Sequence, residues 1–371
     1  MIGWQEAKLN MLLESKIMVF NYLIIGQGLA GTLLGHRLEK AGKTVCYLDH
    51  PQQTAASEVA AGIINPITGR RYVKSWRIDD LLPEARSLYA ELETLLGIKL
   101  WYDLPLVRTL FNRSELNQWD VRSGDDSYQQ YTEDNPDLGV FSELTQPAFA
   151  YAGIRETARV DIAKLVSSYR EKLTQEARFI ATAFDYDSIR TNSDGNFNVA
   201  TFEAEAIIFC EGWRGRENPW FNYLPFGGAK GEVLRVKLAG PTPTKMFKHR
   251  IFLVPQEDDS YWVGATAENR FTDDQPTPEN AAYLEDRLKE LVTVPYKIHN
   301  HQAAVRPTTK DRRPFLGRHP DQKRLIIFNG LGTKGASLGP LCSRWLTDYL
   351  LDNQELPDEV NISRFSLPEG H

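Results

Sequence analysis

"IIGQGLAG", residues 24–31, places three glycines directly after a run of apolar and β-branched residues. The stretch that leads into it, "VFNYLIIG" (19–26), is typical of a buried strand, and "LAGTLLGHRLEKAG" (29–42) carries apolar residues at helical spacing. A second strand, "KTVCYLD" (43–49), follows the predicted helix. A glycine pattern alone is weak evidence, but the order strand, glycine turn, helix, strand predicts a dinucleotide-binding unit.

Each glycine of this turn has an expected task. Gly26 would allow the tight turn, Gly28 would let the backbone approach a pyrophosphate, and Gly31 would let the helix pack closely on the strand. Leu29 and Ala30 stand at the start of the helix. The backbone amides there point toward an anion, so we expect them to hold phosphate.

The residues that follow narrow the choice of nucleotide. Asp49 ends the second strand and is placed to accept a hydrogen bond from a ribose hydroxyl, which disfavours the 2′-phosphate of NADP. The next stretch, "TAASEVAAGIINP" (54–66), is rich in small residues that allow a large flat ligand to lie against the backbone. This stretch favours FAD over NAD, and from it we assign to the cofactor Ala56, Ser57, Ala61 and Gly62.

Composition limits the function classes. The chain has 371 residues, of which 42% are hydrophobic and 25% charged, so two globular units with sizeable cores are possible. A net charge of −6 argues against a global basic field, and we expect no nucleic-acid partner. Three widely spaced cysteines in apolar runs favour buried, reduced thiols in a cytoplasmic chain. No apolar stretch reaches the roughly 18 residues of a membrane span, and the histidines show no metal-ligand spacing.

The pattern along the chain predicts an α/β fold with an antiparallel insertion. Helices are expected near 79–97, 161–177 and 279–292, and strands from residue 231 to 268 suggest an antiparallel sheet. The last block, 325–351, again reads strand, glycine loop, helix. Because α/β patterns occur at both ends of the chain, we expect a discontinuous nucleotide domain.

Four further stretches carry motifs in the order in which one known family has them. They are "EAIIFCEGWRG" (205–215), "IFLVPQEDDSYWVGATAE" (251–268), "AAVRPTTKDRRPFLGRHP" (303–320) and "NGLGTKGASLGP" (329–340). With the first turn, they make the chain from Met18 to about Leu351 resemble the D-amino-acid oxidase-like family of FAD oxidoreductases, which includes glycine oxidase, sarcosine oxidase and D-amino-acid dehydrogenase. The resemblance is specific for fold and cofactor and much less specific for substrate.

This resemblance implies a Rossmann-like FAD-binding domain with an inserted antiparallel-sheet α+β substrate domain, as in the glutathione-reductase type of fold. The FAD-binding domain would comprise residues 18–80, 155–225 and 306–351. The substrate domain would comprise residues 81–154 and 226–305. Residues 1–17 would be an N-terminal extension, and the acidic tail, 352–371, is expected on the surface.

The resemblance also implies a reaction and an acceptor. A neutral amine, from a small amine or a primary or N-substituted α-amino acid, would pass a hydride from its α-carbon to flavin N5, and the imine would hydrolyse. The electron acceptor that reoxidises the flavin, oxygen or a quinone, stays open. Further cofactor contacts are implied for the glycine turns that follow two later strands, at Gly212, Trp213, Gly330, Gly332, Thr333, Lys334 and Gly335.

Two cations are the expected catalytic residues. Arg306 matches the family's carboxylate anchor, and a guanidinium can grip a planar carboxylate with two parallel hydrogen bonds. Lys334, in "GLGTKGAS", would stabilise reduced flavin or hold the substrate carboxylate. His301, just before the Arg306 signature, could line the substrate pocket or lie in the core.

The sequence departs from the family at two points. Phe252 stands where relatives such as glycine oxidase have a tyrosine that helps to hold the substrate carboxylate, which puts glycine itself in doubt as a substrate. The signature around Arg306 has no cysteine for a cysteinyl-flavin bond, so we expect FAD to be noncovalent.

Two other functions stay open. One is an oxidase related to the FAD half of the bifunctional tRNA-uridine modification enzyme, suggested by "AAGIINP" and the basic cluster Arg70, Arg71, Lys74 and Arg77. That cluster could equally screen phosphate, attract a multiply acidic substrate or form a solvated face. The other is a protein that keeps FAD without turnover.

Overall fold

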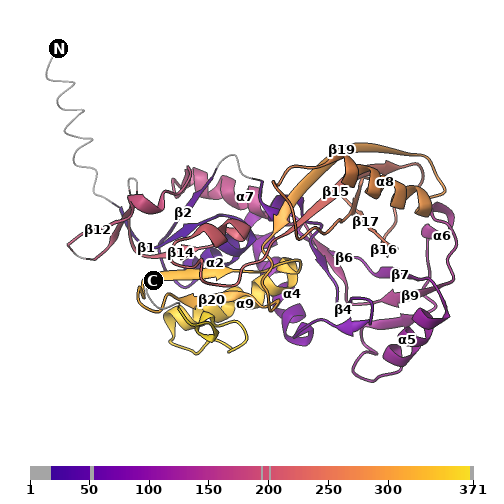
Figure 1. Cartoon of the computed structure of the whole chain (residues 1–371), viewed down its shortest axis with the longest axis horizontal. Coiled ribbons are helices and arrows are strands. Elements are labelled where there is room, and N and C mark those ends of the chain that lie inside the picture. The colour runs from indigo at the N-terminus through magenta and orange to yellow at the C-terminus, as the bar shows by residue number, and fades with distance from the viewer. Residues whose placement is uncertain (1–17, 51–53, 194, 200–201, 368–371) are drawn as a thin grey trace, which may run out of the picture.

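The computed structural model describes residues 18–50, 54–193, 195–199 and 202–367. The chain forms two lobes, each built on its own large sheet (Figure 1). The expected N-terminal extension, 1–17, lies outside the described residues. The mixed α/β class predicted from the sequence is confirmed.

The first lobe contains a parallel sheet. Its five parallel strands lie side by side in the order β11 (Phe179–Ala181), β2 (Val45–Asp49), β1 (Met18–Ile25), β14 (Phe202–Phe209) and β21 (Leu325–Asn329). Antiparallel strands complete it, namely β12 (Arg190–Thr191), β13 (Phe197–Val199) and β20 (Phe315–Arg318). Because β1 lies between β2 and β14, the glycine turn after β1 opens at the carboxyl edge of the sheet, where ligands of such folds bind.

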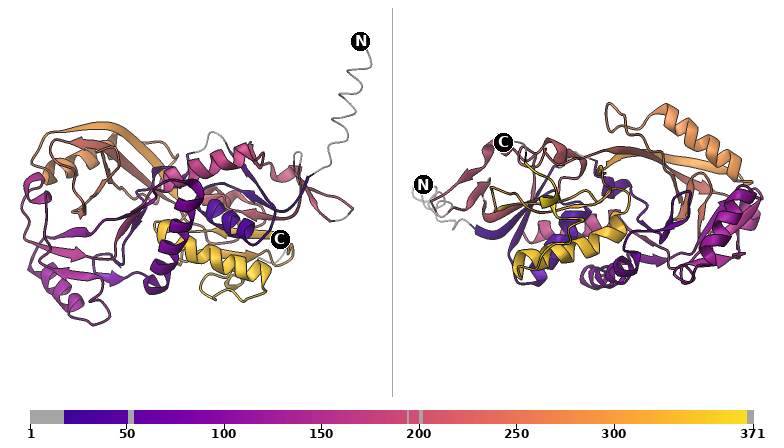
Figure 2. Two further views of the ribbon diagram at one scale, coloured as in Figure 1. Left: turned by 180° about the vertical axis from the view of Figure 1, so that it is seen from behind. Right: turned by 60° about the horizontal axis from the view of Figure 1, so that its bottom comes forward.

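Helices cover this sheet. They are α2 (Leu29–Lys40), α4 (Ile78–Leu96), α7 (Ile162–Gln175) and α9 (Gly335–Leu351). Helix α9 packs on both α2 and α4, and Figure 2 shows it in yellow along one face of the lobe. The apolar faces that α2 and α9 bury, with Leu33, Leu34, Leu341 and Leu346 fully enclosed, hold the two glycine loops against each other.

The second lobe contains an eight-stranded sheet. Its order is β19 (Tyr296–Arg306), β15 (Ala229–Leu238), β18 (Tyr261–Gly264), β17 (Phe252–Pro255), β16 (Met246–Lys248), β7 (Leu106–Leu110), β9 (Ala150–Ile154) and β8 (Thr132–Asp134). Neighbours are antiparallel except β16 and β7, which are parallel. Three helices accompany this sheet, α5 (Arg113–Ser123), α6 (Phe141–Leu144) and α8 (Pro278–Leu291).

Short elements join the lobes. A three-stranded sheet consists of β3 (Ile63–Ile64), β10 (Ala158–Val160) and β6 (Trp101–Asp103), and a hairpin of β4 (Ile67–Thr68) and β5 (Val73–Lys74). The remaining short helices are α3 (Ala56–Val59), η1 (Tyr186–Ser188), η2 (Gly212–Glu217) and η3 (Ile362–Arg364). Of these, α3 contacts both α7 of the first lobe and β19 of the second, and η2 also contacts β19, so the small-residue segment and the turn after β14 lie at the boundary between the two large sheets.

The expected helices correspond to α4, α7 and α8, with ends shifted by a few residues. The domain limits stay a prediction, although the strands of the two sheets come from the expected ranges. One element crosses a proposed limit: most of α4 was assigned to the substrate domain from residue 81, yet it packs on α9 of the first lobe.

The acidic tail lies on the surface, as expected, with Asp352, Glu355, Asp358 and Glu359 exposed, but apolar residues anchor it. Val360 is completely buried and Ile362 is 2% exposed. The Leu316 amide donates to the Val360 carbonyl at 2.9 Å, so the tail lies alongside β20. Arg364 pairs with Asp311 at 3.0 Å. Apolar residues spaced between the acids anchor the segment, and net acidic composition alone did not reveal this.

Candidate active site

A cavity of about 1260 Å³ lies where the two lobes meet. It is lined by the glycine turn after β1, by the segment around α3, by the loop before α9 and by strands of the eight-stranded sheet. This volume exceeds the roughly 300–1,000 Å³ of a typical small-ligand pocket. The cavity therefore has room for an extended ligand and a second, smaller one.

The glycine turn is shaped by close backbone approach. Gly26 has φ +95°, and a Cβ there would lie 2.5 Å from the Cys210 carbonyl oxygen. A Cβ on Gly31 would lie 2.1 Å from the Gly26 carbonyl oxygen. Gly28 lines the cavity, and no side chain caps the start of α2. Free amide groups of the first helical turn are therefore available to an anion at this end.

Asp49 also lines this end of the cavity, and it is held in place. Its Oδ2 accepts a hydrogen bond from Arg170 Nη2 at 2.7 Å, and its Oδ1 accepts one from the His50 amide at 3.0 Å. Arg170 Nε in turn donates to the Gln27 side chain at 2.6 Å. Burial raises the pKa of Asp49 and Arg170 opposes that rise. The carboxylate is thus oriented before any ligand binds.

Glu211 is a second carboxyl group at this end, and the sequence did not indicate it. It follows β14 and lines the cavity. Tyr186 and Asn218 donate hydrogen bonds to its two oxygens, the latter at 2.8 Å. Burial raises the pKa of Glu211 to about 7 despite these donors. This group can therefore exchange a proton near neutral pH.

Arg306 ends β19 and lines the other half of the cavity. Its Nη1 donates to the Thr266 carbonyl at 3.2 Å. Gly231 leaves the space for this guanidinium, because a Cβ there would lie 2.0 Å from Nη2. In the part of the chain that the structure describes, no carboxylate forms an ion pair with Arg306, and burial lowers its pKa. Arg306 is only partly exposed, and a partly buried cation without a counterion attracts a ligand carboxylate strongly.

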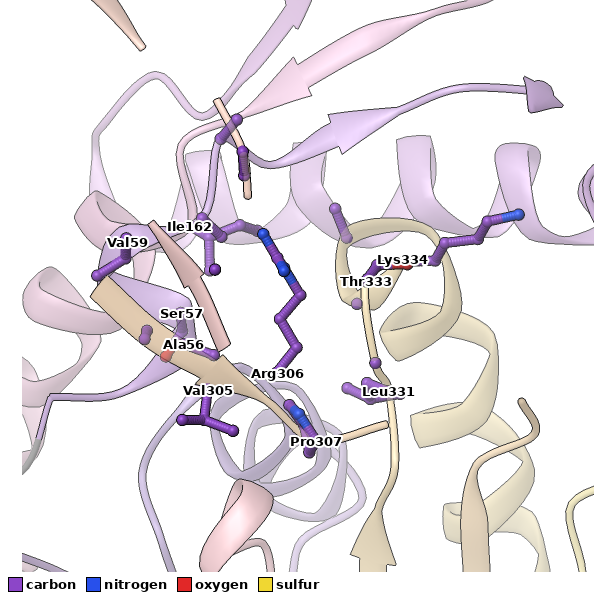
Figure 3. Close-up of a pocket in the computed structure, with 18 of the residues that line it drawn as sticks. Ala56, Ser57, Val59, Ile162, Val305, Arg306, Pro307, Leu331, Thr333 and Lys334 are labelled. Carbon is purple, nitrogen blue, oxygen red and sulfur yellow. The ribbon is translucent and has the colours of Figure 1, made fainter. Parts of the chain in front are cut away.

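Lys334 caps α9 and contributes to the cavity wall. Its ammonium donates to the Thr68 hydroxyl at 3.2 Å and to the Ser75 hydroxyl at 3.0 Å. Figure 3 shows its side chain pointing away from Arg306. Burial, followed by Arg313 and Arg312, lowers its pKa. Its charge therefore sits behind the loop that precedes α9, on the opposite side from the Arg306 guanidinium.

Phe252 lines the cavity beside a lysine that the sequence did not single out. The Lys248 ammonium lies 4.2 Å from the centre of the Phe252 ring and donates to the Arg250 carbonyl at 3.0 Å. Burial, followed by the charge of Arg108, lowers the pKa of Lys248 to about 8. Arg108 stacks on Tyr72 at 4.5 Å, and it also lines the cavity.

Comparison with protein families identifies the group to which this chain is related. The family described as FAD dependent oxidoreductase (DAO) matches residues 21–349, which is most of the chain. The chain belongs to this family. It is accordingly an FAD-dependent oxidoreductase, as the sequence predicted.

Individual relatives agree with the DAO family assignment. Glycine oxidase from Bacillus licheniformis is 24% identical over 90% of this chain and 94% of its own length. The crystal structure of glycine oxidase from Geobacillus kaustophilus superposes with a TM-score of 0.77, at 21% identity, over 95% of this chain and 99% of that one. Iminodiacetate oxidase from Chelativorans sp. BNC1 gives a TM-score of 0.71 at 22% identity, over 93% of this chain and 98% of that one. The fold is therefore the DAO fold.

The residues present fit FAD. Gly26 and Gly28 form a cradle that a Cβ would narrow, and uncapped amides at the starts of α2 and α9 open on the same cavity. The cradle and Arg306 line one and the same cavity. Pyrophosphate at the α2 turn and a ring system near the loop before α9 are the parts that these donors match.

Most residues assigned to the cofactor do line the cavity. They are Gly26, Gly28, Leu29, Ala30, Asp49, Ala56, Ser57, Ala61, Gly62, Gly212, Trp213, Gly332, Thr333, Lys334 and Gly335. Gly31 and Gly330 do not line it, so their contact with the cofactor stays a prediction. A Cβ on Gly31 would meet the Gly26 backbone and one on Gly330 would lie 2.6 Å from the Thr309 side chain, so both glycines allow close packing.

His301, for which the sequence left a pocket or a core position open, faces a buried carboxylate rather than the cavity. His301 is not among the cavity residues, and its Nε2 lies 2.8 Å from a carboxylate oxygen of Glu232. Glu232 is fully buried and also accepts from Thr277 and Asn280. The histidine thus belongs to a structural network beneath α8.

The basic residues that follow the small-residue segment lie in two different environments. Lys74 pairs with Asp79 at 2.6 Å and Arg77 with Asp80 at 2.9 Å, whereas Arg70 lines the cavity. Cys46, Cys210 and Cys342 are free and buried, as expected. Among the described residues, no group of side chains suited to a metal ion occurs, and no helix is long and apolar enough to cross a membrane.

Proposed function

We propose that this FAD-dependent oxidoreductase oxidises the carbon–nitrogen bond of an α-amino acid. The observation that carries the proposal is the Arg306 guanidinium, which lies partly buried in the cavity wall and has no ion-pair partner among the described residues. Relatives named glycine oxidase and iminodiacetate oxidase support an amino-acid substrate.

The chemistry that FAD supplies when bound is a two-electron oxidation, in which the carbon–hydrogen bond next to nitrogen breaks, the hydride passes to the cofactor and water hydrolyses the imine. Arg306 binds the substrate carboxylate with two parallel hydrogen bonds and so fixes the α-carbon. Phe252 and Trp262 supply apolar walls, and Trp262 is fixed by donating to the Val59 carbonyl at 2.8 Å. These walls exclude water from the reacting carbon.

Three finer assignments accompany this proposal. Lys334 supplies positive charge behind the loop before α9, where it favours an anionic cofactor. Phe252 has no hydroxyl with which to hold a carboxylate, which favours substrates larger than glycine. FAD is bound without a covalent link, so acid precipitation should release free FAD into the supernatant, and a yellow pellet would contradict that assignment.

An anaerobic amino-acid panel tests the proposal. The holoenzyme is mixed with primary and N-substituted α-amino acids, and the visible absorption band of the oxidised flavin is followed. Loss of the band with at least one amino acid is expected, and peroxide formation in air then identifies an oxidase. A band that no amino acid or amine bleaches would refute the proposal and favour a protein that keeps FAD without turnover.

A further inference from the structure

Arg108 and Lys248, to which the proposed function gives no role, project from the same face of the eight-stranded sheet. Arg108 on β7 pairs in register with Lys248 on β16, and Lys248 pairs with Phe252 on β17. The row continues through Gly264 on β18 to Val233 on β15. Directly paired residues point to one face of a sheet, so these side chains share the face that borders the cavity.

Arg306 belongs to this same face. It pairs with Ala229 on β15, and Ala229, Gly231 and Val233 alternate onto one side of the strand. The Arg306 guanidinium lies over Gly231, whereas the Lys248 ammonium lies over Phe252. These two points are two strands apart, which is roughly 10 Å across the sheet. The cavity therefore has a cation at each end of its sheet-lined wall.

The far pair of cations has no ionic partner within the described chain. Lys248 donates to the Arg250 carbonyl, and Arg108 Nη1 donates to the Gly69 carbonyl at 3.0 Å. Glu115, which also lines the cavity, acts on Arg108 through its charge without forming an ion pair, and it accepts from the Phe111 amide at 3.0 Å. The hydrogen-bond acceptors recorded for the two cations are backbone carbonyls, and neither cation forms an ion pair within the described residues, so an anion can neutralise their charge.

We infer that Arg108 and Lys248 form a second carboxylate subsite, so that the preferred substrate is an amino dicarboxylate. This inference rests on the proposed function, because Arg306 must hold the α-carboxylate at the other end. A span of roughly 10 Å between the cations suits two carboxylates a few carbon–carbon bonds apart. Arg70, which also lines the cavity, adds to the positive field at this end.

A structural role is the competing explanation for both cations. Arg108 stacks on Tyr72 and Lys248 lies over the Phe252 ring, so each could simply support the sheet. If the role is structural, loss of the charge should alter stability and should change the affinity for all ligands by the same factor. If the two cations form a subsite, loss of the charge should weaken the binding of ligands with two carboxylates more than the binding of ligands with one. Binding of non-oxidisable acids separates these explanations and requires no turnover.

The probes are glutarate and pentanoate, which have the same number of carbons and differ in one terminal carboxylate. Each is titrated into oxidised holoenzyme, and the shift of the visible flavin spectrum gives Kd. We expect glutarate to bind about tenfold more tightly than pentanoate, and Lys248→Met to remove most of that preference. Lys237→Met, an exposed lysine on β15, is the matched control and should preserve the preference.

Equal affinity for the two acids in the wild-type protein would overturn the inference, as would a Lys248→Met variant that keeps the preference. Arg108→Gln provides a second variant should Lys248→Met fail to fold, and it should reduce the preference in the same direction. A panel in which no amine bleaches the flavin would refute the proposed function, whereas these binding constants would still report on the subsite. The two failures are therefore distinguishable.

Discussion

The two ends of the cavity are built in different ways. One end is lined by the glycine turn (24–31) and the small-residue segment (54–66), and we call it the nucleotide end. Its wall consists mostly of backbone, and both segments lie close together in the sequence, between residues 24 and 66. The substrate end consists of side chains from strands that are distant in sequence, such as Arg108 and Lys248. A local motif can therefore specify the first end, whereas only sheet register specifies the second.

The sharpest contrast at the nucleotide end is between two glycines of the same turn. Gly31→Ala would place a Cβ 2.1 Å from the Gly26 carbonyl oxygen, whereas Gly28→Ala would meet only the Ser57 hydroxyl at 3.3 Å. We expect Gly31→Ala to cost about 3 kcal/mol or more and to abolish FAD retention. Gly28→Ala leaves the packing of α2 on β1 intact, so it should cost much less stability, although its Cβ would narrow the cradle for the pyrophosphate. Urea unfolding of the two variants measures the difference, and equal losses of stability would contradict this account of the turn.

At the substrate end, Arg306→Lys should weaken carboxylate binding while FAD stays bound. A lysine keeps the charge but cannot form two parallel hydrogen bonds, so we expect a loss of about 2–3 kcal/mol, roughly 30- to 150-fold in Kd. Titration of holoenzyme with pentanoate measures this loss. Unchanged affinity would show that Arg306 does not hold the carboxylate.

The far cations should respond to pH within the physiological range. Lys248 has a pKa lowered to about 8, so its positive charge is present below pH 8 and is lost as pH rises through that value. Arg108 on β7 is the charged residue that acts on Lys248, the neighbouring His249 feels the charge of Lys248, and the Arg250 contact is through the backbone carbonyl alone. Glutarate affinity should therefore fall by about tenfold between pH 7 and pH 9, with little change for pentanoate. Parallel pH profiles for the two acids would contradict this assignment.

The smallest expected effect concerns Glu211. Its pKa is raised from 4.5 to about 7 in the folded protein, so the folded state binds the proton more tightly than the unfolded state. The contribution of Glu211 to stability is therefore fully present below pH 4.5 and is lost as pH rises to about 7, by about 1 kcal/mol after allowance for solvent in the cavity. Glu211→Gln should flatten this dependence. Urea unfolding at pH 5 and pH 8 measures it, and an unchanged pH slope in the variant would contradict it.

The same contrast explains what the sequence could predict. The sequence predicted the turn at Gly26, the position of Asp49 and the segment after it, because this motif and its spacing are local. Arg306 was found through its signature, yet Lys248 and Arg108 were missed because their proximity depends on the parallel pairing of β16 with β7. His301 looked suitable because of its position beside the signature, but alternation along β19 and β15 directs it toward Glu232.

The acidic tail and Glu211 show two further limits. The acidic composition of the tail predicted a surface position but did not reveal that a few apolar residues, including Val360, pack it against β20. Glu211 gave no signal, since a lone glutamate after a strand is ordinary until burial and two donors surround it. Tertiary environment, rather than residue type, determines the behaviour of such groups.

The central claim is that this flavoprotein oxidises an amine whose carboxylate Arg306 holds. An anaerobic comparison of an α-amino acid with the amine that lacks its α-carboxylate tests this claim most directly. The amino acid that is most active in the panel and its decarboxylated counterpart are each mixed with wild-type holoenzyme, and the rate of flavin reduction is recorded. We predict that the amino acid reduces the flavin at least about 30-fold more efficiently than the amine. Equal rates for the two compounds would contradict the account.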